Sequence, residues 1–392
     1  MTQESIIQEL SKNEPIWFQE KRKEALELFQ KLPMPSFRYG IGIYTDVSDL
    51  DLATITPTTT SNEWVCINTD QVDVMPFKDA FTKHEQLIKD FYMTQVNENK
   101  LTALHTAFLN NGILIYIPKN TQVTKPIYLT TETDTNTRID HVLVVTEENT
   151  NVKIIEISRS KETATKVFRS HIIEVIAKEN SKIEYITIQD LSRNVHNFSK
   201  RNGTTETNAT IDWVDCQLGS TLTHSSNITK LNGLGSQSTS TGIVFGNNTQ
   251  RFDINTQTTH VGSKTSSNMI TKVVLNDSAK TVYRGLVKIN PNAQSCTGYQ
   301  KDDTILLSED AKASAVPNLE ISNNDVKCSH GATVSQIDED KLFYMMTRGV
   351  SEKVAKRSIV EGFFSPILHK ITDTNLRLDI KKTINKRIGA LE

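Results

Sequence analysis

The sequence is poor in cysteine, in blocks of one charge and in long apolar runs. Its 392 residues hold four widely spread cysteines and no C-x-x-C pair: Cys66, Cys216, Cys296 and Cys328. This spacing favours a reduced protein over a disulfide framework, and it is not a tetrahedral zinc pattern. Lys and Arg number 44 against 46 Asp and Glu, for a net charge of −2, which argues against a partner rich in phosphate such as nucleic acid. The longest apolar runs, such as 112–117, are too short to span a membrane.

Several nucleotide-binding and catalytic motifs are also missing. The sequence has no G-x-x-x-x-G-K-[ST] phosphate loop, no G-x-G-x-x-G after a strand, no G-x-S-x-G and no H-E-x-x-H. If nucleotide chemistry is involved, a partner must therefore supply it. The first residues, MTQESIIQELSKNEP, lack the basic start and apolar core of a secretory signal. We therefore expect a cytosolic protein.

Residues 1–100 are predicted to form an N-terminal domain that is helical and mixed. Residues 1–35 have helical spacing, Asn13 can cap the helix, and Pro15 suits its first turn. Pro33 ends it. The remainder of this domain alternates short strand-like runs with a second helical stretch, KDAFTKHEQLIKDFY.

Residues 101–335 are predicted to form a β-rich core, opened by a short helix, LTALHTAF. Strand-like runs such as VKIIEI, KIEYITI and TIDWVDC recur, and turn residues separate them. Three of these runs each follow an Asn-containing turn at a period of roughly 30 residues, and later turns resemble them. A turn-and-strand repeat without helices favours a β-solenoid, in which stacked coils supply the core and helical segments at both chain ends could cover the open ends. An antiparallel sandwich or barrel remains the alternative.

Residues 336–392 are predicted to form a C-terminal helical domain. Asp338 can cap a helix that stops at Gly349, Ser351 can cap the next, and Pro366 breaks or kinks that one. The last helix carries an apolar stripe at every fourth residue: Leu376, Ile380, Ile384 and Ile388. The stripe can dock on the same chain or on a partner, and intramolecular docking is the interpretation we favour.

Cys328 and His330 are the candidate metal ligands. They lie two residues apart, so their side chains share a face in a strand, and thiolate and imidazole both suit soft or borderline metals. Two ligands do not make a site, and the others would have to come from elsewhere in the fold or from a second chain. The alternative is a buried thiol acting as a small hydrophobe beside a hydrogen-bonded histidine. The other cysteines and His260 are interpreted as structural.

Asp302 and Asp303 are the candidate carboxylates of a carbohydrate-processing β-helix. Adjacent residues in a strand point to opposite faces, so they make a poor acid–base pair. A solvated turn between two coils is the interpretation we favour.

Four stretches of the sequence resemble one known family. They are PIWFQEKRKEALELFQKLPMPS, LTALHTAFLNNGILIYIPKNTQVTKPIYL, TTHVGSKTSSNMITKVVLNDSAKTVYRGLVKI and PNLEISNNDVKCSHGATVSQIDEDKLFYMMTRGVSEKVAKRSIVEGFF. In this order they resemble the SufB/SufD family of the SUF iron–sulfur cluster assembly system, and the last stretch resembles its SufD type. The resemblance implies a right-handed parallel β-helix flanked by N- and C-terminal α-helical domains. It also implies two partners: SufB, joined through the β-helix near its C-terminal end, and the SufC ATPase, bound by the C-terminal helices.

The resemblance also separates the two family types at particular residues. SufB-like chains carry a sulfur-accepting cysteine where this chain has Asp302, and they tend to have His-Glu where this chain has His330-Gly331. The resemblance therefore implies a SufD-type scaffold without catalytic residues or a tightly bound cofactor. It implies that His330, with Cys328 as a second candidate, faces SufB as a ligand of a transient iron–sulfur cluster. The alternatives are a SufB-like sulfur-accepting scaffold, a purely structural partner, and a homodimer of the isolated chain.

Overall fold

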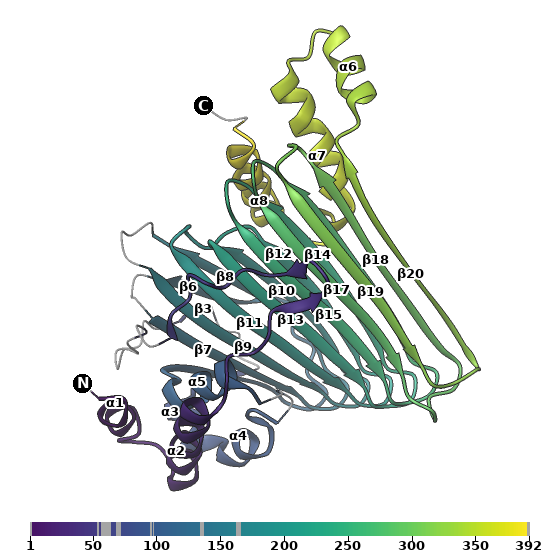
Figure 1. The fold of residues 1–392 in the computed structure, drawn as a ribbon. Helices are drawn as coiled ribbons and strands as arrows, with labels where there is room; N and C mark the ends of the chain where they lie inside the picture. The colour runs from purple at the N-terminus through teal and green to yellow at the C-terminus, as the bar shows by residue number, and fades with distance from the viewer. Residues whose placement is uncertain are drawn as a thin grey trace.

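The structure is a computed structural model, and it describes residues 2–52, 55, 64–67, 72–94, 96, 98–133, 137–161 and 166–389. In this part of the chain two long sheets face each other and form a parallel β-solenoid, with helices at both chain ends (Figure 1). The predicted fold class is confirmed. The antiparallel sandwich or barrel is excluded for the core, because each long strand pairs in parallel with the strand two places further along the chain.

The described strands of the solenoid divide into two nine-stranded sheets, named here after their last strands. The β20 sheet contains β3 (Val65–Ile67), β6 (Ile127–Thr133), β8 (Asn151–Ser160), β10 (Lys182–Asp190), β12 (Thr210–Gln217), β14 (Gln237–Gly246), β16 (Ser266–Leu275), β18 (Cys296–Leu306) and β20 (Val326–Gln336). The β19 sheet contains β4 (Asp73–Pro76), β5 (Asn111–Ile117), β7 (Thr137–Thr146), β9 (Val167–Ala177), β11 (Val195–Thr205), β13 (Leu222–Leu231), β15 (Arg251–His260), β17 (Lys280–Ile289) and β19 (Lys312–Ile321). Only the first strands, β3 and β4, pair antiparallel to their neighbours.

A column of asparagine turns sets the repeat. Asn120, Asn149, Asn180 and Asn208 have positive φ angles of 55–63°, a backbone region that asparagine tolerates better than most residues. Each side-chain amide donates to the amide oxygen of the previous coil, at 3.0, 3.1 and 3.2 Å. These turns are the Asn-containing turns that the sequence repeat predicts.

The space between the sheets is apolar near the asparagine turns and polar further away. Next to the turns, inward side chains such as Val175, Ile183 and Ile211 form one buried cluster. Towards the other end of the same strands, the inward positions are polar or charged, as at Arg169 and Glu156. The solenoid therefore combines a hydrophobic core with a buried polar network.

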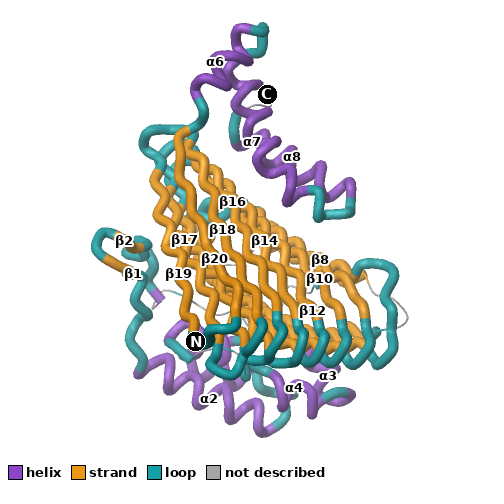
Figure 2. Tube along the Cα trace, turned by 90° about the vertical axis from the view of Figure 1, so that its right-hand side faces the viewer, coloured by secondary structure: helices purple, strands orange, loops and turns teal. Residues whose placement is uncertain are grey.

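The N-terminal helices pack against the outer face of the β19 sheet, at its first strands (Figure 2). They are α1 (Gln3–Leu10), α2 (Ile16–Lys31), α3 (Phe77–Lys83), α4 (Glu85–Phe91) and α5 (Lys100–Phe108). The single helix predicted over 1–35 is wrong: the chain breaks after Leu10, and Pro15 rather than Asn13 precedes the second helix. The second predicted helix is likewise two helices that meet at His84.

A strap formed by residues 36–52 crosses the outer face of the β19 sheet (Figure 1). It contains the short hairpin of β1 (Arg38–Gly40) and β2 (Ile43–Tyr44). Asp49 in the strap accepts hydrogen bonds from Arg251 at 2.8 and 2.9 Å. The hydroxyl of Tyr39 donates to Asp253. Asp49 also lies 3.1 Å from Nε2 of His196 on β11, so polar contacts fasten the strap to more than one coil.

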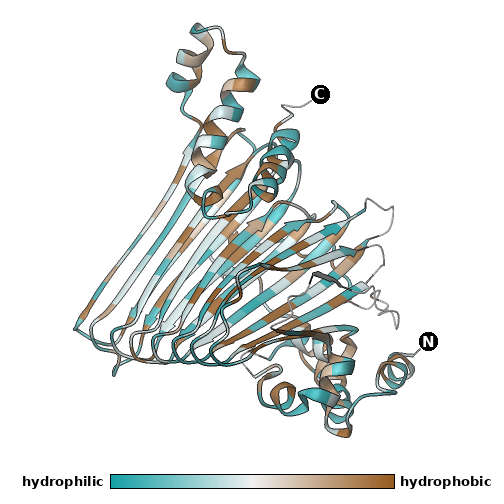
Figure 3. Cartoon of the chain, turned by 180° about the vertical axis from the view of Figure 1, so that it is seen from behind, coloured by the Kyte–Doolittle hydropathy of each residue, from teal (hydrophilic) through white to brown (hydrophobic). Residues whose placement is uncertain are grey.

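The C-terminal helices are α6 (Glu339–Thr347), α7 (Glu352–Leu368) and α8 (Thr374–Arg387). Leu376, Ile380 and Ile384 are buried in one cluster with α7 and the outer face of the β20 sheet (Figure 3), so intramolecular docking of the stripe is confirmed. Asp338 caps α6 through a hydrogen bond from the Lys341 N–H, as predicted. Of the predicted break or kink at Pro366, the break is excluded, because α7 continues to Leu368.

Both helical regions lie on outer faces of the sheets, so the expectation that they cover the open ends of the solenoid is wrong at the C-terminal end. There β20 and β19 are edge strands. Among the described residues, no helix is long and apolar enough to cross a membrane.

Candidate functional site

The candidate ligands lie on β20, the edge strand of the last coil. β20 pairs in parallel with β18, which places Cys328 beside Gly298 and His330 beside Gln300. Gly298 and Gln300 are both buried and face the interior of the solenoid. Paired residues of neighbouring parallel strands point to the same face of a sheet. Cys328 and His330 therefore share one face, as predicted, and that face is directed inward at the open end of the solenoid.

Cys328 is the more enclosed of the two. It is half-buried and packs with Val326 and Leu319. A Cβ atom added at Gly298 would lie 3.3 Å from its sulfur, so the absence of a side chain there leaves space for the thiol. Burial raises the pKa of Cys328. The thiolate is the form that binds metal, so a metal ion bound here would displace the thiol proton.

His330 is exposed, and the described part of the chain contains no hydrogen bond or ion pair to its imidazole. Its neighbour Gln300 is fully buried and donates from Nε2 to the Asn318 carbonyl at 3.0 Å. This contact joins β18 to β19 directly beneath the last coil. The imidazole therefore stands on a fixed strand with its nitrogens available to a ligand.

A groove of about 490 Å³ runs along the edge of the last coils. Its lining residues come from β16, β18 and β20: Ser267, Asn268, Thr297, Gly298, Tyr299, Val326, Lys327, Cys328 and Ser329. Cys328 therefore opens onto the groove, whereas His330 lies beyond it on the same strand. The arrangement supplies two soft or borderline ligands. Across the described ranges, no group of three or more His, Cys, Asp or Glu side chains is placed to hold a metal ion.

Asp302 and Asp303 lie in the middle of β18, so their interpretation as a solvated turn is wrong. They do point to opposite faces. Asp302 is buried in the interior, where Thr304 donates to it at 3.3 Å and burial raises its pKa to about 7. Asp303 faces outward and pairs with Lys301 at 3.0 Å. The two carboxyl groups cannot flank one glycosidic bond.

The remaining cysteines and His260 have structural surroundings where they are described. Cys216 is buried against the C-terminal helices, and burial raises its pKa. Cys296 is buried, and its sulfur lies 3.1 Å from the Thr265 hydroxyl. Both ring nitrogens of His260 have hydroxyl partners, at 2.7 and 2.8 Å. The side chain of Cys66 lies outside the described residues.

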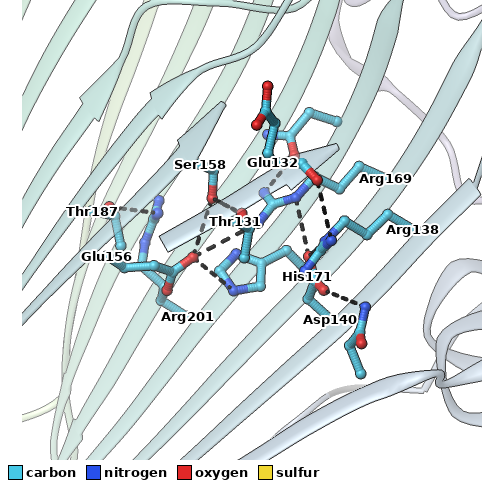
Figure 4. Close-up of polar contacts among 12 residues, drawn as sticks. Thr131, Glu132, Arg138, Asp140, Glu156, Ser158, Arg169, His171, Thr187 and Arg201 are labelled. Carbon is cyan, nitrogen blue, oxygen red and sulfur yellow. Dashed lines mark hydrogen bonds and ion pairs between the residues drawn. The ribbon is translucent and has the colours of Figure 1, made fainter. Parts of the chain in front are cut away.

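A buried ionic network that was not predicted from the sequence lies inside the first coils (Figure 4). Asp140 is fully buried, accepts from Arg138 Nε at 2.8 Å and lies 3.3 Å from Arg169 Nε. On the facing sheet, Glu156 lies 3.1 Å from His171 Nε2 and 3.7 Å from Arg169. Burial lowers the pKa of His171 well below its ordinary value, so this histidine is neutral near pH 7.

The network continues one coil further through Arg201, whose guanidinium donates to Asp215 at 2.8 and 2.6 Å. A space of about 10 Å³, enough for a single water molecule, borders Arg201 and Asp215. The ion pairs of the network join the two sheets. The available sequence signal was a set of arginines in otherwise buried strands, where an unpaired charge is costly.

The sequence that forms this architecture matches a known protein family. Residues 128–363 match the family described as "SUF system FeS cluster assembly, SufBD core domain". The chain belongs to the SufBD family. Residues 59–129 match a second description, the SufBD protein N-terminal region.

Curated relatives of this SufBD protein come from staphylococci. An iron–sulfur cluster assembly SufBD family protein of Staphylococcus saprophyticus is 28% identical over 420 residues, covering 94% of this chain and 89% of the relative. Similar proteins of Staphylococcus epidermidis and Staphylococcus aureus are 27% identical with the same coverage. Family membership gives this chain a role in iron–sulfur cluster assembly. The relatives carry the shared family name, without division into the SufB and SufD types.

Proposed function

We propose that this SufBD protein is a SufD-type, non-catalytic scaffold subunit that works in the cytosol with SufB and the SufC ATPase. The observation that carries the proposal is the last coil of the solenoid. It is an uncovered end that presents His330 on its inward face, where stacking of another coil would enclose it. Stacking of a partner on this coil would form an interface, called the seam below. A nascent iron–sulfur cluster is bound at the seam only transiently.

The edge strands favour pairing with a second β-helix. β19 and β20 each have a neighbour on one side only, so their outer backbone groups are free to pair with another chain. Several of their inward positions are apolar, and two of these, Ile321 and Val334, are 42% and 44% exposed. Such a surface suits pairing with a solenoid of the same cross-section. Under this proposal the partner solenoid is SufB, and a second copy of this chain binds at the same seam when SufB is absent.

The ligand set favours a shared cluster. His330 supplies an exchangeable imidazole, and Cys328 would contribute as a thiolate whose proton the bound metal displaces. The remaining ligands would come from SufB. Asp302 stands where the resemblance places the sulfur-accepting cysteine of SufB-like chains, and a carboxyl group cannot carry a persulfide. This favours the SufD type over a SufB-like sulfur acceptor.

The helix α6 favours docking of the ATPase. It stands away from the ends of the strands (Figure 1), and only Leu342 within it is buried. Phe343, Tyr344 and Met346 are 69%, 59% and 43% exposed. An apolar surface of this kind on a helix marks an interaction site. The sequence has no phosphate loop, so a partner would supply ATP hydrolysis.

A purely structural partner is the second candidate function, and the packing of the half-buried Cys328 against an apolar cluster favours it. In that case this chain would complete the heterodimer and carry one SufC without touching the cluster.

The test replaces His330 with Ala in the chain co-expressed with SufB and SufC, and uses Ser329→Ala on the same strand as the control. Both variants should co-purify with the partners as the wild type does. Iron and acid-labile sulfide per complex should fall at least about tenfold in H330A only, the loss expected when a ligand is removed. A wild-type content of iron and sulfide in H330A would favour the purely structural role instead. A third variant, Phe343→Asp, should lose SufC while retaining SufB, and retention of SufC would place its docking elsewhere.

A further inference from the structure

A cavity of about 80 Å³ lies on the outer face of the β19 sheet, far along the chain from the open end. Residues 35–37, which lead into the strap, form one wall, and α5 forms another. The floor comes from β9, β11 and β13. The cavity therefore lies at the junction between the N-terminal helices and the solenoid.

Lys200 is the cation of this cavity. It lies on the outer face of β11, in phase with Phe198, and is half-buried. In the described part of the chain, no hydrogen bond or ion pair engages its ammonium group. Burial lowers the pKa of Lys200 to about 8, and no carboxylate offsets this. A desolvated charge without a counter-charge is costly to keep in a folded protein.

Other enclosed lysines of this chain have partners. Lys21 donates to the Tyr92 carbonyl at 2.9 Å and is attracted by Glu174. Lys272 donates to the Phe363 carbonyl at 2.9 Å and lies over its ring. Lys200 differs from both, because its neighbourhood supplies a space instead of an acceptor.

The rest of the lining consists of neutral donors and apolar walls. The hydroxyl-bearing residues on this face are Ser36, Thr102 and Ser170, of which Thr102 donates to the Asn99 carbonyl at 2.9 Å. His224 lies between the rings of Phe37 and Phe198, with centroids 5.4 and 6.0 Å away. Burial lowers the pKa of His224, so it is neutral near pH 7 and can donate one N–H. Among the residues that the structure describes, no Asp or Glu lines the cavity.

One cation, several neutral donors and no carboxylate are the chemistry that recognises an oxyanion. We propose that this cavity binds a small oxyanion of the carboxylate or phosphate class, with Lys200 as the group that neutralises it. The volume fits a group of a few heavy atoms and excludes a nucleotide. The anion bridges the sheet to α5 and to the start of the strap, so its binding stabilises the junction by mass action. The site is independent of the open end and of the cluster ligands.

The test compares the wild-type chain with Lys200→Met and with the control Lys230→Met, whose side chain is exposed on the same face of β13. Inorganic phosphate and acetate are added separately, against chloride at equal ionic strength. The thermal midpoint of the wild type and of K230M should rise with one or both anions, and that of K200M should not respond. Without anion, K200M should be at least as stable as the wild type, because it removes an uncompensated charge.

A second measurement needs no variant. Trace labelling of amines with acetic anhydride should modify Lys200, and phosphate at ten times its dissociation constant should slow that labelling about tenfold. A response to phosphate alone assigns the phosphate class, and a response to acetate alone assigns the carboxylate class. The proposal is overturned if neither anion protects Lys200 from labelling, or if K200M keeps the wild-type response.

Discussion

The two ends of the solenoid are built from the same repeat and differ in what covers them. In the first coil, the inward residues Ile115, Ile117 and Leu129 are fully buried. Trp64 lies over the guanidinium of Arg138 at 5.7 Å and extends the packing beyond that coil. In the last coil, the corresponding inward positions are half-buried or exposed, as at Ala315 and Val334.

This difference shows that the burial of a solenoid coil depends on what stacks on it. Each coil buries one side of its neighbour, so an end coil keeps half of its contacts unmade unless another part of the chain supplies them. The first coil has its own chain for this purpose, and a dense ionic network lies in the coils next to it. The last coil has neither, and it carries the exposed His330. The open end is therefore the place where a partner gains most from binding.

The largest effect is expected at Asp302, the buried carboxyl near the open end. Burial raises its pKa to about 7, so between pH 4 and pH 7 the folded state holds a proton that the unfolded state releases. The free energy of unfolding should fall as pH rises through this window, by up to about 4 kcal/mol. Asp302→Asn should remove that fall, and urea unfolding at pH 4.5 and 8 measures it. Equal pH dependence in the wild type and D302N would contradict the burial of this carboxyl.

The next effect tests the closed end. Asp140→Asn removes a buried charge that Arg138 and Arg169 share, and it should lower the free energy of unfolding by about 3 kcal/mol. The matched control is Asp303→Asn on the outer face of β18, where one ion pair to a half-exposed lysine is worth less than about 1 kcal/mol. Denaturant unfolding at pH 7 compares them. Similar losses in both variants would show that the two ends do not differ in electrostatic burial.

The smallest effect concerns the turns. Near the first coils the positive-φ position is Asn, as at Asn180, whereas near the last coils it is Lys264 and Ser295. Lys264→Gly should raise the free energy of unfolding by about 0.5 kcal/mol, because glycine adopts this backbone without a steric penalty. Asn180→Gly should instead lower it by about 1 kcal/mol, because it removes two amide hydrogen bonds of the ladder. A rise of the free energy of unfolding in Asn180→Gly as well would show that the ladder contributes nothing.

Local pattern predicted much of the fold because the repeat is local in sequence. Asparagine turns recur at the coil period, and alternation along β20 places Cys328 and His330 on one face without knowledge of the neighbours. The helix boundaries around His84 and Leu10 were not predicted, because apolar spacing continues across both breaks.

The candidate site was predicted only in part, because burial depends on what stacks above a strand. Pattern could not show that Asp302 is buried while Asp303 pairs with a surface lysine, since either face of β18 could have been the inner one. Nor could it show that Arg138 and Arg169 converge on Asp140 across two coils. Lys200 gave no sequence signal, because its isolation results from segments distant in the chain.

The period, the turn positions and the alternation of each strand follow from local sequence alone, since they depend on backbone conformation and on residues a few places apart. The tertiary structure decided which face is interior, which charges are shared and which end is left open. Those properties depend on stacking between coils roughly 30 residues apart, and on where helices from both chain ends find an apolar face to cover.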